Sequence, residues 1–213
     1  MDHKLNIKFG EVNNLSDARY AAGAGATFLG FNLSTSHPQY IAPEKIKEIC
    51  GWVSGPIPVA EWGNEPASII SDTCNSLGME YIQLNAFNPE ITAALKMDFC
   101  VIQNIEIGAE DHLAGLIEKV NKVNGLAMYY MLSFKDLSSQ EMFLSKESHC
   151  LMVKDFCRDQ PIFLNFHFTP ENLPGLIDQF QPFGINLNGS AESKPGVKDF
   201  STLNDLVSLL EKS

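Results

Sequence analysis

The chain has 213 residues, which fits one domain, and 45% of them are hydrophobic, enough for a large core. Its formal net charge of −11 argues against nucleic acid and anionic membrane surfaces as partners, because both need clustered lysine and arginine side chains. No stretch has the length of a membrane span, and the N-terminus is too polar for a signal peptide. We therefore expect one cytoplasmic domain over residues 1–213.

The cysteines are five in number and form no C-x-x-C pair, so they indicate neither a disulfide framework nor a zinc site. Cys150 and Cys157 lie seven residues apart, on one face of a predicted helix and close to His149. Buried free thiols explain this spacing better than a metal site does. We expect no metal ion and no cofactor, and we expect His37 and His149 to be surface groups.

Short apolar strands alternate with amphipathic helices along the whole chain, which is the pattern of a parallel α/β fold. Eight strands are predicted, at Leu5–Phe9, Thr27–Asn32, Ile57–Glu61, Tyr81–Asn85, Phe99–Ile105, Leu126–Leu132, Ile162–Phe166 and Gly184–Leu187. Capping side chains or first-turn prolines predict helix starts at Ser16, Pro43, Pro89, Pro170 and Ser201. Residues 133–146 are predicted as a loop that leads into the sixth helix. Eight strands favour a closed (β/α)8 TIM barrel over an open doubly wound sheet.

Seven segments of the chain contain motifs that recur in one family. They are Lys8–Ala18, Gly23–Phe31, His37–Pro43, Asn64–Pro66, Gln83–Asn85, Phe163–Asn172 and Phe183–Asp199, the last with Pro-Gly-Val-Lys-Asp at its end. In order and spacing they resemble phosphoribosylanthranilate isomerase of tryptophan biosynthesis. The resemblance spans most of the chain and implies a (β/α)8 barrel of the ribulose-phosphate-binding type.

The resemblance also implies which residues should carry the reaction, and several are replaced. In that family a cysteine at the end of the first strand is the general base, and this position is Gly10 here. The general acid is an aspartate after the sixth strand, and the segment Leu126–Phe134, where the resemblance places it, contains none. The arginine that holds the anthranilate carboxylate is Gln39, and the histidine after the fourth strand is Asn85. The paired glycines that seat the phosphate after the seventh strand are Phe166 and His167.

A ligand would bind at the C-terminal face of the barrel, where inward side chains and loops meet. The candidate binding residues are Gln39, Asn85, Asn165, Asn188, Gly189 and Ser190, of which the last three stand where the family has Ser-Ser-Gly. Period-two alternation also turns Lys8 toward the barrel interior, where its ammonium needs a partner such as Gln83 or Asn186.

Three acid–base groups remain as catalytic candidates. Glu11 and Glu61 end the first and third strands, and His167 follows the seventh, so all three are expected near the catalytic face, with solvated loop acids as the simpler interpretation of the two glutamates. The chain is then a silent or repurposed small-molecule-binding barrel, a divergent enzyme that uses these groups, or a working isomerase with substitute residues. The replacements favour the first hypothesis. An open polar pocket would fit an enzyme, and a mouth plugged by Phe166 would fit a silent barrel. Ligand identity and oligomeric state are not indicated.

Overall fold

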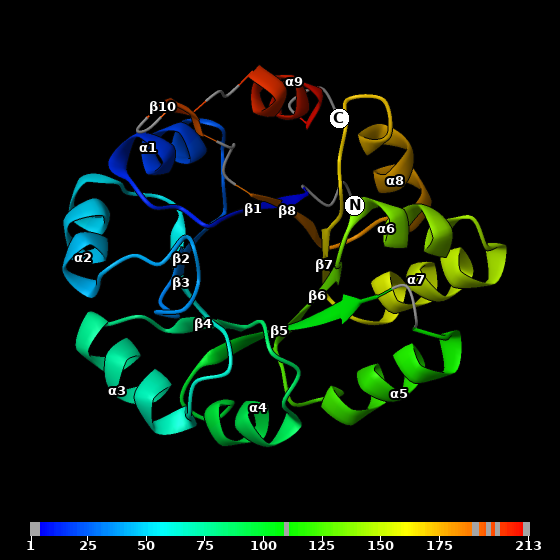
Figure 1. Ribbon diagram of the computed structural model, residues 1–213, viewed down its shortest axis with the longest axis horizontal. Helices are drawn as coiled ribbons and strands as arrows, with labels where there is room; N and C mark the ends of the chain where they lie inside the picture. Colours follow the sequence, from blue (N-terminus) through cyan, green and yellow to red (C-terminus); the bar gives the residue numbers. More distant parts are fainter. Residues whose placement is uncertain (1–4, 109–110, 189–191, 195–196, 199–200, 211–213) are drawn as a thin grey trace.

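The computed structural model describes residues 5–108, 111–188, 192–194, 197–198 and 201–210. Eight parallel strands, paired in sequence order from β1 to β8 and back to β1, form a closed barrel with the helices around it (Figure 1). The predicted (β/α)8 fold is confirmed.

The strands of the barrel are β1 (Asn6–Gly10), β2 (Phe28–Asn32), β3 (Ile57–Trp62), β4 (Tyr81–Leu84), β5 (Cys100–Ile107), β6 (Tyr129–Phe134), β7 (Ile162–Asn165) and β8 (Gly184–Asn188). Two short strands, β9 (Glu192–Lys194) and β10 (Val197–Lys198), form an antiparallel pair. All eight predicted strands are present. The sixth begins at Tyr129 and not at Leu126, because Leu126 N–H closes a turn onto the Val123 carbonyl and Gly125 adopts a left-handed conformation with φ of 72°.

The helices are α1 (Leu15–Gly23), α2 (Pro43–Trp52), α3 (Ala67–Leu77), α4 (Pro89–Leu95), α5 (Leu113–Val123), α6 (Leu137–Leu144), α7 (Glu147–Asp159), α8 (Leu173–Phe180) and α9 (Ser201–Leu210). In the described part of the chain, none of them is long and apolar enough to cross a bilayer. The start of α4 is as predicted, with the Asn88 side chain accepting the N–H groups of Glu90 and Ile91.

Two predictions about helices were wrong. Pro170 does not begin a helix, because Thr169 N–H donates to Asn172 Oδ1 at 2.9 Å in a turn, and α8 starts only at Leu173. Residues 133–146 are not a loop, because β6 continues through Phe134 and α6 fills most of the remainder. This helix is short and buries the polar Ser139 and Gln140, so its sequence lacks the apolar stripe on which a helix prediction depends.

The barrel interior changes character along its axis. Its lower part is filled by the apolar side chains of Phe28, Val59, Ile102, Met131 and Phe163. Inward positions nearer the C-terminal ends of the strands are polar, beginning with the fully buried Lys8. The floor of the barrel is thus a packed core, and the polar layer above it forms the site.

His149, which was expected at the surface, is buried in α7, and its ring centroid lies 4.3 Å from that of Phe143. On the same helix Cys157 is buried and Cys150 half-buried, both as free thiols, and burial raises the pKa of Cys157 to about 12. The described residues include no group of three histidine, cysteine or acidic side chains suited to a metal ion.

Mild acid should lower the free energy of unfolding less in the His149→Leu variant than in the wild type. Burial, followed by the nearby Lys146, lowers the pKa of His149. Below about pH 6.5 the unfolded histidine takes up a proton that the folded one resists, so the free energy of unfolding falls as the pH drops through this window. Urea unfolding of both proteins at about pH 7.5 and about pH 5.5 measures the difference. Equal losses in the two proteins would contradict this role.

Candidate functional site

A cavity of about 340 Å³ opens at the C-terminal end of the barrel. This volume lies near the lower limit of small-molecule pockets, which is about 300 Å³. Its lining is rich in carboxamides and also holds three carboxylates. The carboxamides are Asn32, Gln83, Asn85, Asn104, Asn165, Asn186 and Asn188, and the carboxylates are Glu11, Glu61 and Glu106. The ring of Phe166 does not plug this opening, because it packs outside the barrel, 4.8 Å from the ring centroid of Phe134.

The base of the cavity is a buried ion pair. Lys8 on β1 is fully buried, forms an ion pair with Glu61 on β3, and donates a hydrogen bond to Asn186 Oδ1 at 3.1 Å. Asn186 was a predicted partner of Lys8, but Gln83 was not found in this role. Glu61 is only 2% exposed, so its interpretation as a solvated loop acid was wrong. Gly30 on β2 leaves room for the pair, since an added Cβ would lie 2.7 Å from Lys8 Nζ.

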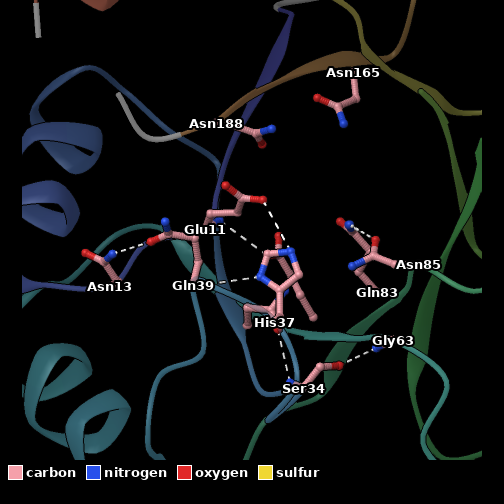
Figure 2. Close-up of polar contacts among 12 residues, drawn as sticks. Glu11, Asn13, Ser34, His37, Gln39, Gly63, Gln83, Asn85, Asn165 and Asn188 are labelled. Carbon is pink, nitrogen blue, oxygen red and sulfur yellow. Dashed lines mark hydrogen bonds and ion pairs between the residues drawn. The ribbon is translucent and has the colours of Figure 1, made fainter. Parts of the chain in front are cut away.

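Glu11 and His37 meet at the rim of the cavity (Figure 2). Glu11 follows β1 in a left-handed conformation with φ of 57°, and its backbone N–H donates to Glu61 Oε2 at 3.3 Å. His37 Nε2 lies 3.8 Å from Glu11 Oε1, while His37 Nδ1 accepts the Gln39 N–H at 3.2 Å. In the neutral imidazole the hydrogen therefore sits on Nε2 and faces the carboxylate. His37 was expected only as a surface group, although the loop after β2 places it at the C-terminal end of the barrel.

The carboxamides of the lining bind one another. Asn186 Nδ2 donates to Asn188 Oδ1 at 2.7 Å and to Asn165 Oδ1 at 3.1 Å. Across the cavity, Gln83 Nε2 donates to Asn85 Oδ1 at 2.7 Å (Figure 2). The carbonyl oxygen of Gln83 is buried and has no hydrogen-bond partner among the described residues. A lining of this kind offers donors and acceptors in similar numbers.

The structure brings together only part of the predicted site. Among the predicted binding residues, Asn85, Asn165 and Asn188 line the cavity, while Gly189 and Ser190 lie outside the described residues. Gln39 does not line it, and its side-chain oxygen accepts a hydrogen bond of 2.5 Å from Asn13. Of the catalytic candidates, Glu11 and Glu61 line the cavity. His167 is exposed and outside the lining, and its backbone N–H donates to Gln140 Oε1 at 2.7 Å.

The space above Gly10, at the end of β1, is occupied by two carboxamides. An added Cβ would lie 2.8 Å from Asn188 Oδ1 and 3.2 Å from Asn186 Oδ1. Contacts this short force the neighbouring side chain to move. On the far side of the barrel, β6 contributes Ser133, whose hydroxyl donates to Asn104 Oδ1 at 2.9 Å. A larger side chain at position 10 therefore requires a rearrangement of the amide network.

The described lining carries little positive charge to attract an anion. It contains no arginine, and Lys8 lies beneath it, already paired with Glu61. Glu11 and Glu106 add negative charge at the rim, where the one basic side chain of the described lining is His37. Like charges in a partly desolvated cavity repel more strongly than they do in water. The electrostatics of the described site thus favour neutral or cationic molecules.

Comparisons with known proteins agree on one family. The family model described as N-(5'-phosphoribosyl)anthranilate (PRA) isomerase matches residues 7–208. The chain is 23% identical to the N-(5'-phosphoribosyl)anthranilate isomerase of Pelobacter propionicus, over 98% of this chain and 97% of that protein. It is 25% identical to the Aquifex aeolicus enzyme of the same name, over 95% of this chain and 97% of that protein.

Solved structures support the same architecture. Phosphoribosyl anthranilate isomerase from Thermus thermophilus superposes with a TM-score of 0.79 at 22% identity, covering 98% of this chain and 99% of that one. A phosphoribosyl anthranilate isomerase in complex with reduced 1-(o-carboxyphenylamino)-1-deoxyribulose 5-phosphate gives 0.78 at 22% identity, covering 98% of this chain and all of that one. At this identity the likeness establishes the fold.

Proposed function

Because the chain belongs to the N-(5'-phosphoribosyl)anthranilate isomerase family of tryptophan biosynthesis, we propose that it is a small-molecule-binding member that does not catalyse the isomerisation. It keeps the barrel, and its open, polar cavity, which Phe166 does not plug, argues against a wholly silent barrel and supports a site that still binds a ligand. On this proposal the cavity serves recognition of a ligand, and no proton transfer to a sugar takes place there.

One observation carries the proposal, namely the site at the end of β1. Gly10 offers no group that could accept a proton, and the carboxamides of Asn186 and Asn188 occupy the space where a side chain would project. General acid–base catalysis needs a titratable group within hydrogen-bond reach of the proton that it moves. Glu61, the buried carboxylate at the base of the cavity, is held by Lys8, and β6 ends without an acid.

The charge of the cavity lining is a second observation, and it does not favour the binding of a phosphate. The described lining has no arginine and carries carboxylates at its rim, which supports a ligand other than the phosphorylated substrate named by the family. Residues 189 and 190, which stand where the family seats its phosphate, lie outside the described part of the chain.

Purified protein assayed with N-(5'-phosphoribosyl)anthranilate should turn over at least about 10⁴-fold more slowly than a family enzyme measured in parallel. A general acid and a general base each contribute about 10²–10⁴-fold, and both are replaced here. The Thermus thermophilus relative is the positive control. Turnover within about tenfold of the control, or rescue of a tryptophan auxotroph that lacks the enzyme, would refute the proposal and support a working isomerase with substitute residues.

A divergent enzyme that acts on another small molecule is the second candidate. It is favoured by the Glu11–His37 pair, in which a carboxylate on a strained backbone faces an imidazole of defined tautomer at the cavity rim. Backbone strain of this kind concentrates at functional sites. In this version Glu11 and His37 would exchange protons with the ligand, and Glu61 would position Glu11. His167 would have no part, because it is outside the lining.

A further inference from the structure

We propose that the cavity selects an uncharged polyhydroxylated molecule of monosaccharide size over the corresponding sugar phosphate and over an aromatic acid. The inference rests on the proposed function, because it assumes that the cavity binds a small molecule. It adds the chemical class of that ligand. Three properties of the described lining carry it, which are its hydrogen-bonding groups, its charge and its few apolar side chains.

The hydrogen-bonding groups match hydroxyl groups. A carboxamide presents a donor and an acceptor side by side, and a hydroxyl is likewise both donor and acceptor. Gln83 is the central case, since the residue is 95% buried, lines the cavity and has a side-chain carbonyl oxygen without a partner in the described structure. A buried acceptor left in this state is unfavourable. This oxygen is enclosed in the structure, so a ligand hydroxyl would satisfy it once the Gln83 carboxamide turns toward the cavity.

The charge of the cavity lining favours a neutral sugar over a phosphorylated one. The carboxylates of Glu11 and Glu106 lie at the rim, and the ammonium of Lys8 is bound by Glu61 beneath them. A phosphate entering the described cavity would lose water and gain no unpaired cation in return. A neutral polyol pays no such penalty, and a carboxylate can accept hydrogen bonds from two of its hydroxyl groups.

The apolar lining is too small for an aromatic ring. Among the described lining residues, the sizeable apolar side chains are those of Pro38 and Phe134, and the rest of the wall is polar. Aromatic ligands bind mainly through apolar and aromatic contacts, with few polar groups around them. The cavity therefore fits a compact molecule with hydroxyl groups on every side.

Calorimetry and saturation-transfer NMR would test the wild-type protein against three sets of probes. These are neutral pentoses, hexoses and cyclitols, then ribose 5-phosphate and glucose 6-phosphate, and finally anthranilate. We expect at least one neutral probe to bind at least about tenfold more tightly than every phosphorylated probe and than anthranilate. The isosteric Gln83→Met should weaken that binding at least about tenfold.

Two further variants separate recognition from folding. Gln160→Met makes the same chemical change at the C-terminal end of α7, outside the cavity, and should leave binding unchanged. Glu106→Gln should strengthen binding of the phosphorylated probes relative to the neutral ones, because it removes one rim charge. Thermal melts show whether each variant is folded.

Each outcome decides the inference. Tighter binding of a sugar phosphate or of anthranilate than of every neutral probe would overturn it and leave the ligand-binding role standing. Failure of all probes to bind would overturn it too. Wild-type-like binding by a folded Gln83→Met would remove its central contact and overturn it. Isomerase turnover in the separate assay would instead refute the proposed function, whatever the probes show.

Discussion

Replacing Lys8 with methionine should lower the free energy of unfolding by about 3–5 kcal/mol. Lys8 is fully buried and is the ion-pair partner of Glu61, which is itself 2% exposed. Methionine fills similar space, so the main effect is an uncompensated carboxylate in the barrel interior. Asn186 also loses the hydrogen bond that it accepts from Lys8. Urea unfolding followed by circular dichroism measures the change.

A matched control is available on the surface. Lys45 forms an ion pair with Glu48 on α2, where their side chains are 46% and 55% exposed, and Lys45→Met should change stability by about 0.5 kcal/mol or less. The double variant Lys8→Met with Glu61→Gln should be more stable than the single Lys8 variant, because no charge is left buried. A loss of under about 1 kcal/mol in Lys8→Met would show that the pair is not the main support of the cavity floor.

The same pair shows how far the sequence could predict the site. Strand alternation correctly turned Lys8 and Asn186 inward, because that inference needs only the period of a strand. It could not identify Glu61 as the partner, because this carboxylate lies 53 residues away on β3 and reaches Lys8 past the intervening strand β2, over Gly30. The inward direction of each side chain was predictable, whereas the pairing depended on the order of the strands and the curvature of the sheet.

The fold was predicted more completely than the site. Strand order and the barrel follow from repeated short-range patterns, whereas α6, which lacks such a pattern, was assigned to a loop, and the short pair β9 and β10 was not predicted. The rim residues lie in loops, where no periodicity applies. His37 was therefore taken as a surface group, and His167 was placed near a cavity that it does not line. Both errors come from loop geometry, which the register of the strands does not determine.

The polar upper layer of the barrel interior indicates a ligand-binding role and not only structural support. A barrel of this size can fill its interior with branched apolar side chains, as the lower layer does here with Val59, Ile102 and Met131. Polar side chains in the upper layer are less favourable unless they are satisfied, and Gln83 keeps an unpartnered oxygen in the described structure. Unsatisfied polar groups that lower stability in this way are expected at sites that bind a ligand. The polar upper layer therefore favours a ligand-binding cavity over a barrel whose mouth has no role.

Gly184→Ala should destabilise the protein by about 3 kcal/mol, near the upper end of what overpacking costs. Gly184 begins β8, where it pairs with Asn6 of β1 and with Phe163 of β7. An added Cβ would lie 2.5 Å from the Asn6 carbonyl oxygen and 2.5 Å from Cε1 of Phe163. The Asn6 backbone is fixed by its strand, and the Phe163 ring is enclosed by Phe28, 5.7 Å away between centroids. Relief therefore requires the strands that close the barrel to move apart.

Gly175→Ala is the matched control, because it makes the same substitution within α8. Apart from its chain neighbours and the backbone of its own helix, no described atom lies within 4 Å of a Cβ built there, so alanine should stabilise the helix by about 0.5–1 kcal/mol. Chemical denaturation of the two variants beside the wild type should therefore give changes of opposite sign. If Gly184→Ala proved as stable as the wild type, the contact between β8 and β1 would be looser than the register of the barrel requires, and the closure drawn in Figure 1 would be wrong at this seam.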